Sequence, residues 1–183
     1  MRTRHLLAFL AILPLAAQEP QPPKPTPHHE AMKALEGTWD ATFKVFGEPG
    51  KPPMEGKGVE VNTRILGGFW LQSEVTADMG GMPFQGRGLF GYDTMAKKHV
   101  GTWVDSTGSW PANSRGTCKD HCREVTVTFD GWGMDGKPVT FKEVCIQKDD
   151  DHRTMAMYVK GRDGKFVCNM EMAYTRRKVG PRD

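Results

Sequence analysis

The stretch FQGRGLFGYDTMAKKHVGTWVD, residues 84–105, contains two β-rich runs separated by the turn-forming segment DTMAKK. Residues that flank a hairpin turn pair with each other, so we expect Tyr92 to lie opposite His99. Side chains alternate with a period of two along a strand, which places Tyr92 on one face with Trp103 and Asp105. The stretch therefore predicts an antiparallel hairpin whose aromatic face forms an interior wall.

Similar runs continue along the chain, separated by turn signals every 8 to 15 residues. A short helix is predicted before them, because Thr26 can cap it, Pro27 suits its first turn, Leu35 closes its apolar face and Gly37 ends it. The regular spacing of short strands, without crossover helices, predicts an all-β antiparallel barrel or sandwich and excludes a parallel doubly wound fold. The ten runs cover residues 38–46, 58–66, 69–77, 84–92, 98–105, 112–118, 122–130, 137–147, 153–160 and 165–176.

Residues 1–17 have the three regions of a secretory signal peptide. Arg2 and Arg4 supply the positive charge, residues 6–15 are almost wholly apolar, and small residues precede the expected cleavage after Ala17. The apolar run is too short to span a hydrocarbon core of about 30 Å, so we expect no stable membrane insertion. The segment predicts an exported protein, periplasmic or secreted.

The rest of the chain predicts one domain. Residues 18–27 include the proline-rich sequence EPQPPKPTP and are expected to form a stiff spacer, residues 28–178 the barrel, and residues 179–183 a tail. Hydrophobic residues make up 38% of the chain, and counting the 21 Gly and leaving out the three Tyr brings the apolar share to about 48%, which is ordinary for a globular protein and excludes disorder throughout. The formal charge of +3 falls to about +1 once Arg2 and Arg4 are removed, so we expect no nucleic-acid partner. We expect a monomer.

Five motifs in order resemble the DUF1579 family over residues 35–177. They are EGTW at 36–39, LGG at 66–68 followed by Trp70, GYD at 91–93, GTWVDS at 101–106 and YTRR at 174–177. The resemblance implies an up-and-down lipocalin-like (calycin) β-barrel with a cup for a small ligand, and no established activity. Because a lipocalin has eight strands, two of the ten runs are expected to be short ends or halves of one bent strand.

Barrel closure is also implied by this resemblance. Gly37-Thr38-Trp39 followed much later by Arg176 is similar to the lipocalin arrangement in which a first-strand Trp floors the barrel and a last-strand Arg lies across it. A guanidinium over an indole contributes roughly 0.5–2 kcal/mol and closes that end to water.

The candidate ligand-binding residues are polar groups placed among aromatics on expected strands, as in apolar cavities that bind small molecules. Alternatively, the carboxylates Asp105 and Glu143 pair only with Arg64, Arg87 or Arg153 in a structural network. The set is Trp39, Trp70, Gln72, Glu74, Tyr92, Trp103, Asp105 and Glu143.

No catalytic motif accompanies these residues in the sequence. It has neither the Gly-X-Ser-X-Gly of a nucleophile elbow nor the HExxH of a zinc helix. None of the six His falls in the middle of an expected strand facing a cavity, so we expect no haem ligand. The function predicted is binding of a small apolar molecule without catalysis and without a cofactor.

The four Cys of an exported chain suggest disulfides, with three possible pairings. Cys118 and Cys122 flank a three-residue turn and are the favoured pair. A register that sets Thr128 opposite Val139 would instead place Cys122 opposite Cys145. Cys145 and Cys168 are expected on one face but a strand apart, about 10 Å, which is too far for a disulfide without a bulge. The pairing stays open.

Metal binding or redox chemistry is the alternative function. Cys118, His121 and Cys122 offer three zinc ligands in five residues, although a structural site needs a fourth. A sulfur-rich patch suited to Cu(I) comprises Cys145, Met155, Met157, Cys168, Met170 and Met172. The competing interpretation is that these Met only fill the interior. A structural or protein-interaction module with a filled barrel is a further alternative.

Overall fold

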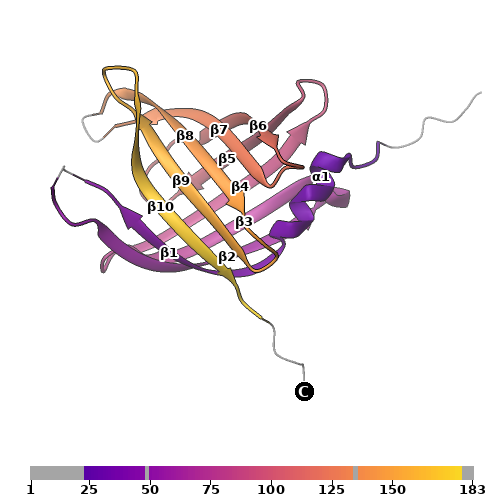
Figure 1. Ribbon diagram of the computed structural model, residues 1–183, viewed down its shortest axis with the longest axis horizontal. Helices are drawn as coiled ribbons and strands as arrows, with labels where there is room; N and C mark the ends of the chain where they lie inside the picture. Colours follow the sequence, from indigo (N-terminus) through magenta and orange to yellow (C-terminus); the bar gives the residue numbers. More distant parts are fainter. Residues whose placement is uncertain (1–22, 48–49, 134–135, 179–183) are drawn as a thin grey trace, which may run out of the picture.

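The computed structural model describes residues 23–47, 50–133 and 136–178. Ten antiparallel strands follow one another around a closed barrel, and the last pairs with the first (Figure 1). The predicted all-β, up-and-down barrel with a short N-terminal helix is confirmed. Each of the ten runs is a strand of its own, so the expectation of eight strands is wrong. The predicted signal peptide and tail lie outside the described residues.

The helical segments and strands have bounds close to those expected. A short α-helix, α1, covers Pro27–Ala31 and continues as a 3-10 helix over Met32–Leu35; a 3-10 turn covers Leu66–Gly68. The strands are β1 Gly37–Val45, β2 Met54–Ile65, β3 Trp70–Asp78, β4 Pro83–Asp93, β5 Lys98–Asp105, β6 Ala112–Lys119, β7 Glu124–Trp132, β8 Pro138–Gln147, β9 His152–Lys160 and β10 Phe166–Arg176.

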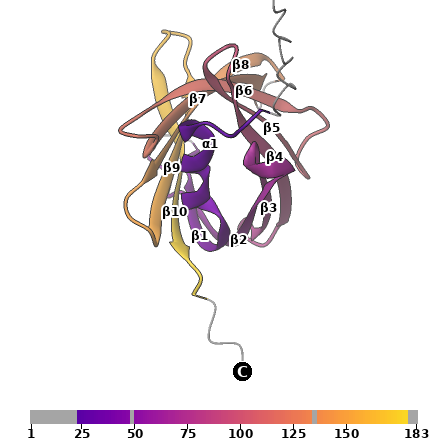
Figure 2. The ribbon, with the colours of Figure 1, turned by 90° about the vertical axis from the view of Figure 1, so that its right-hand side faces the viewer.

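Helix α1 lies across one end of the barrel (Figure 2). Its first turn is capped, because the backbone N–H of Thr26 donates to Nδ1 of the buried His29 at 3.0 Å. The carbonyl of Leu35 at the other end accepts hydrogen bonds from Trp39 Nε1 at 2.8 Å and from Asn62 Nδ2 at 3.1 Å. The helix is therefore fastened to β1 and β2, and we call this the helix end of the barrel.

The hairpin predicted from residues 84–105 forms with the expected register, with Tyr92 opposite His99. Gly86 and Gly88 share the inward face of β4 with Tyr92, and Trp103 pairs with Gly88 from β5. A Cβ at Gly86 would come within 2.1 Å of the Trp103 ring. The glycines thus leave room for the indole to lie flat against the wall.

Two predicted registers are wrong, each because a turn or strand is irregular. If Lys160 paired with Lys165 across the β9–β10 turn, Met157 would lie opposite Cys168. Instead Lys160 pairs with Phe166, which places Cys168 opposite Tyr158, and a bulge between Cys168 and Met170 shifts the register by one further residue, so Met157 pairs with Met170. Strand β7 extends to Trp132, which pairs with Pro138, so the β7–β8 turn is shorter than expected. Cys145 consequently lies opposite Val125 rather than Cys122.

The far end of the barrel, away from α1, is formed by the turns β1–β2, β3–β4, β5–β6, β7–β8 and β9–β10. Most of the buried side chains lie nearer the helix end, among them Trp39, Leu71 and Tyr174 at 0%, 2% and 6% exposure. Exposed apolar side chains border both ends: Phe46, Met82, Trp110, Trp132 and Val167 at the far end, and Leu66 and Met95 at the helix end. The core is therefore concentrated at one end.

Within the described ranges, no helix is both long and apolar enough to cross a membrane.

Candidate functional site

The inner wall of the barrel between β5 and β10 is apolar and only half-buried. Phe129 and Phe141 face inward from paired strands and stack, with ring centroids 5.1 Å apart. Met155 pairs with Met172 on the neighbouring strands, and both pack against the core cluster formed by Trp39, Ala41 and Tyr174. The half-buried inward residues are Trp103, Ala112, Ser114, Val125, Val127, Phe129, Phe141, Met155, Met157, Met170 and Met172.

A buried polar network lies below this wall, toward the helix end. The guanidinium of Arg153 forms an ion pair with Glu60, Nη2 to Oε1, at 2.6 Å. Asn62 Nδ2 donates to the same carboxylate oxygen at 2.6 Å, and Ser73 Oγ donates to Asn62 Oδ1. Arg153 also lies over the Tyr174 ring at 3.7 Å from its centroid. Glu60 is thus paired inside the barrel, as a buried charge requires, whereas Arg153 Nε is buried without a hydrogen-bond partner among the described residues.

Glu143 reaches into the interior from β8, next to this network. Burial raises the pKa of its carboxyl group, while a hydrogen bond from Cys145 Sγ at 3.0 Å acts in the opposite direction. Its side chain nevertheless keeps some accessible surface. The carboxyl group of Glu143 therefore lies in a poorly hydrated part of the barrel interior.

The helix end is closed by Arg176. Its guanidinium lies 4.1 Å from the centroid of the Trp39 ring. Its Nη2 donates to the carbonyl of Ala34 at 2.6 Å, and its Nε donates to the carbonyl of Asp150 at 2.7 Å. One side chain therefore joins the helical segment, the barrel floor and the β8–β9 turn.

The eight candidate ligand residues do not form one site. Trp70, Gln72 and Glu74 lie on the outward face of β3, where Gln72 donates to Glu74 at 3.0 Å. Trp39 is fully buried in the floor. The hydrophobic pattern of β3 favours this register, because the inward row (Leu71, Ser73, Val75 and Ala77) is more apolar than the outward row that carries the three candidates.

Three of the candidates, Trp103, Asp105 and Glu143, face the interior. The carboxylate of Asp105, however, is already hydrogen-bonded to neighbouring protein groups. Its carboxylate accepts hydrogen bonds from Trp103 Nε1 at 2.9 Å and from the backbone of Thr107 at 2.8 Å. Asp105 therefore fixes the Trp103 ring and the β5–β6 turn. Of the expected arginine partners, only Arg153 belongs to the interior network near Glu143.

A hollow of about 560 Å³ lies over the adjacent strands β2, β1, β10 and β9. Its exposed lining side chains, such as Lys44, Glu55 and Glu171, place it on the outer surface. None of the eight candidate ligand residues lines this hollow.

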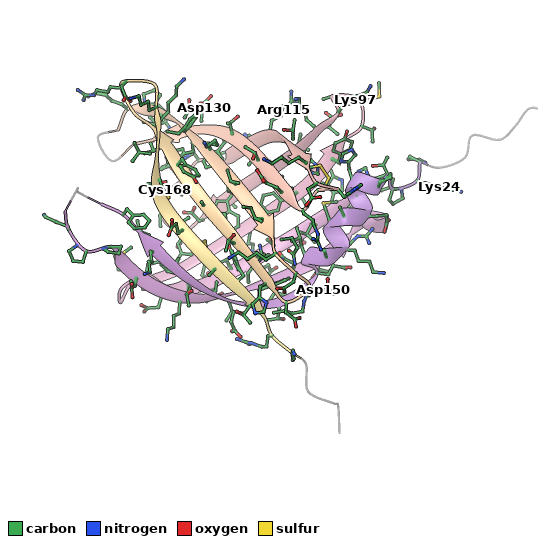
Figure 3. The ribbon with its side chains drawn as sticks, viewed as in Figure 1. Lys24, Lys97, Arg115, Asp130, Asp150 and Cys168 are labelled. Carbon is green, nitrogen blue, oxygen red and sulfur yellow. A yellow bond between two sulfur atoms is a disulfide. The ribbon has the colours of Figure 1, made fainter. Side chains whose placement is uncertain are left out.

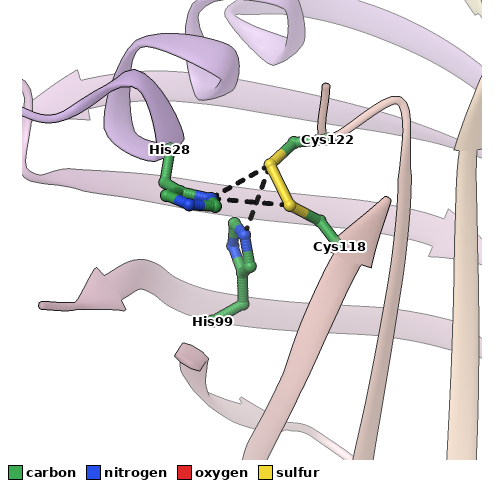
Figure 4. A group of neighbouring side chains, drawn as sticks. All are labelled: His28, His99, Cys118 and Cys122. Carbon is green, nitrogen blue, oxygen red and sulfur yellow. Dashed lines mark hydrogen bonds between the residues drawn. A yellow bond between two sulfur atoms is a disulfide. The ribbon is translucent and has the colours of Figure 1, made fainter. Parts of the chain in front are cut away.

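A second cluster of functional side chains lies at the helix end, where Cys118 and Cys122 are joined in a disulfide (Figure 4). His28 Nδ1 lies 3.2 Å from Cys122 Sγ and 3.5 Å from Cys118 Sγ. His99 Nε2 lies 3.6 Å from Cys122 Sγ. The four side chains come from α1, β5 and the β6–β7 hairpin.

Aromatic packing holds these imidazoles in place. Tyr92, a candidate ligand residue, stacks on His28 with centroids 4.0 Å apart and rings 10° from parallel. The Tyr92 and His99 rings also pack edge to face, with ring centroids 5.1 Å apart. Burial, reinforced by the nearby His28 and His29, lowers the pKa of His99 to about 4. The His99 ring is therefore neutral near pH 7.

The turn that carries Cys122 has an unusual backbone. Asp120, His121 and Cys122 have φ values of 50°, 52° and 64°, in the left-handed region. Such a conformation costs a non-glycine residue roughly 1–2 kcal/mol, and it persists where the surroundings impose it. His121 is exposed and does not join the cluster. Of the three zinc ligands suggested by the sequence, Cys118 and Cys122 belong to the cluster, and His28 and His99 take the place of His121.

The sulfur-rich patch is only partly assembled. Met155, Met157, Met170 and Met172 face inward with Cys145, whereas the bulge places Cys168 outside this row. Figure 3 shows Cys168 along β10, well away from helix α1. Burial also raises the pKa of the Cys145 thiol well above its usual range, which disfavours the thiolate that metals bind.

The closed ten-stranded barrel and its Trp and Arg floor define a calycin-like β-barrel fold. The chain belongs to the protein family of unknown function DUF1579, which matches residues 24–176. The resemblance drawn from the sequence motifs is therefore confirmed.

Two solved structures have similar folds. The crystal structure of Rv2717c from M. tuberculosis has a TM-score of 0.62 and 14% identity, covering 84% of this chain and 99% of that one. The S-type phycobiliprotein lyase CPES from Guillardia theta has a TM-score of 0.56 and 11% identity, covering 82% of this chain and 93% of that one. A comparison with curated proteins found no match. At these identities the likeness to solved structures shows the fold alone.

Proposed function

We propose that this chain is an exported, monomeric binding protein that holds a small, largely apolar molecule inside its barrel, without catalysis. The observation that carries the proposal is the half-buried inner wall, on which Phe129, Phe141 and Met157 keep accessible surface although they point inward. Packed interiors leave few voids larger than a water molecule, so such a wall supports an occupant.

The chemistry of the wall favours a specific kind of occupant. Aromatic and thioether side chains suit an apolar body, and methionine adapts to irregular shapes. Glu143, whose pKa is raised by burial, can hydrogen-bond to one polar group of the ligand. Glu60 and Asp105 are already engaged by protein partners, so neither is placed to act as a free general base. This supports binding rather than catalysis.

Titration with a hydrophobic fluorophore such as anilinonaphthalene sulfonate tests the proposal. Val127 faces the barrel interior between Gly116 and Glu143, so Val127→Trp places a large ring in the space proposed for the ligand. Thr128→Trp adds the same ring one residue further on the outward face. We expect saturable binding by the parent protein, binding weakened at least about 10-fold in Val127→Trp, which is about 1.4 kcal/mol, and no change in Thr128→Trp.

The two variants must first show the same circular dichroism and a cooperative thermal transition. Absence of saturable binding by the parent, or equal loss in both variants, would reject a ligand inside the barrel.

Export is tested separately, by the mass of the protein recovered from an oxidising compartment. We expect loss of residues 1–17, with Gln18 at the new N-terminus. Recovery of the uncleaved chain in the cytoplasm alone would contradict export.

A further inference from the structure

Four potential metal ligands converge at the helix end, apart from the hollow that the proposed function uses. The donor atoms of His28, His99, Cys118 and Cys122 all lie within 4.8 Å of one another. They come from three separate parts of the chain, so their convergence is a property of the fold and not of one motif. His99 is buried, and the other three are half-buried.

The spacing of these atoms fits a tetrahedral site. With Zn–S bonds of about 2.3 Å and Zn–N bonds of about 2.0 Å, each nitrogen lies about 3.5 Å from each sulfur. The three measured nitrogen-to-sulfur distances are 3.2, 3.5 and 3.6 Å. Once the disulfide is reduced, the two sulfurs have to separate to about 3.8 Å, and the other donor pairs, which already lie within 4.8 Å, have to close to the same geometry.

We propose that the reduced form of this protein binds one Zn²⁺ through Cys118 Sγ, Cys122 Sγ, His28 Nδ1 and His99 Nε2. Two thiolates and two imidazoles in a tetrahedron are a set that zinc prefers. Tyr92 holds the His28 ring by stacking, which keeps its Nδ1 aimed at the sulfurs. The proposal is independent of ligand binding in the barrel.

The disulfide and the zinc site are then two states of the same four residues. A pair of external thiols reduces the Cys118–Cys122 bond, giving two cysteine thiols and one external disulfide. Zinc binding displaces one proton from each thiol to solvent. In the reverse direction, a small-molecule disulfide takes two electrons from the two thiolates and two protons from solvent, which gives two small-molecule thiols, the Cys118–Cys122 disulfide and free Zn²⁺.

Zinc would bind helix α1 to the barrel, because His28 is the ligand that α1 contributes. In the disulfide state the same imidazole only contacts the sulfurs. An oxidising compartment favours the disulfide and a reducing one favours the thiols. In the reduced state the zinc ion links helix α1 to the barrel, and in the oxidised state the disulfide links only the two sides of the β6–β7 turn.

The test uses the whole chain carrying Cys145→Ser and Cys168→Ser, so that only the two cluster thiols remain. After reduction under anaerobic conditions we expect one equivalent of Zn²⁺, measured by competition with a chromophoric chelator. Cobalt in its place should show the visible bands of tetrahedral thiolate coordination. Addition of a small-molecule disulfide should release the metal and consume two thiols per zinc.

Matched histidine variants identify the ligands. We expect His28→Gln and His99→Gln each to weaken zinc binding by more than about 100-fold. Loss of a residue that only hydrogen-bonds to a metal ligand costs about 10- to 100-fold, so a larger loss indicates a direct ligand. His121→Gln, in the same turn as Cys122, should bind zinc as the parent does.

A histidine variant could lose zinc because it misfolds. The parent of the test is therefore also measured after oxidation, when it should bind no zinc although neither histidine has been replaced. Zinc binding that survives oxidation, or that depends on His121 and not on His28, would overturn the proposal, as would no binding by the reduced protein.

Discussion

The two ends of the barrel are made of the same ten strands but use their inward positions differently. At the helix end, Trp39, Tyr174 and Arg153 are at most 8% exposed and form one network. Toward the far end, Phe129 and Phe141 face inward yet remain half-buried. The difference indicates that stability is concentrated at one end, which leaves the other free to hold a ligand.

Chain connectivity explains where the closed end lies. The helical segment runs directly into β1, and β10 ends beside it, with Arg176 bridging the two. The carbonyls of Ala34 and Leu35 find donors in Arg176, Trp39 and Asn62. The helical segment before β1 and the end of β10 therefore stabilise the same end of the barrel, whereas the described residues at the far end join neighbouring strands.

The largest expected effect comes from truncating a Trp at each end. Trp39→Ala should lower the free energy of unfolding by about 4 kcal/mol, because it leaves a cavity beneath two guanidinium groups. Trp132→Ala at the far end, where the side chain is 50% exposed, should cost less than about 1 kcal/mol. Urea denaturation of both variants measures the difference. Similar losses in the two would remove the proposed asymmetry.

A smaller effect is expected from breaking ion pairs inside and outside the barrel. Arg153→Ala leaves Glu60 buried without its partner and should cost about 3 kcal/mol. Arg87→Ala removes a pair of 3.8 Å on the outer surface, with Glu74, and should cost less than about 1 kcal/mol.

The double variant Arg153→Met with Glu60→Leu checks the cause of the first loss. Replacing a buried pair by apolar side chains is often neutral, so much of the stability should return. A double variant as unstable as Arg153→Ala would show that packing over Tyr174, and not the unpaired charge, causes the loss.

The sequence predicts the barrel because its signals are local. Turn residues separate the ten strands, and a regular turn such as DTMAKK determines the register that brings Tyr92 opposite His99. The same logic fails where the backbone departs from a regular ladder. The bulge before Met170 has no glycine or proline to signal it, so the placement of Cys168 is missed.

The Cys and His cluster is missed for a different reason. His99 follows from the correct register, since it shares the inward face with Tyr92, but the sequence gives it no partner. His28 contacts the disulfide only because α1 lies across the end of the barrel. His28 and Cys122 are 94 positions apart in the sequence. Such long-range packing leaves no local pattern, whereas His121, adjacent to Cys122 in sequence, is exposed and lies outside the cluster.

The smallest effect should appear only as a dependence on pH. Burial raises the pKa of Glu143 in the folded protein, so the folded state holds its proton more tightly than the unfolded state does. The resulting stability is fully present below the ordinary carboxyl pKa and is lost as pH rises through the raised value. Glu143→Gln removes this loss, so the variant should gain stability relative to the parent as pH increases over that window.

Denaturation midpoints of both proteins across the acidic to neutral range measure this gain. Glu171→Gln, which removes a carboxylate from the exposed face of β10, controls for the change in net charge. A gain that is equal in the two variants would assign the pH dependence to overall charge. A gain confined to Glu143→Gln would show that the hollow desolvates a carboxyl group, as an apolar binding site does.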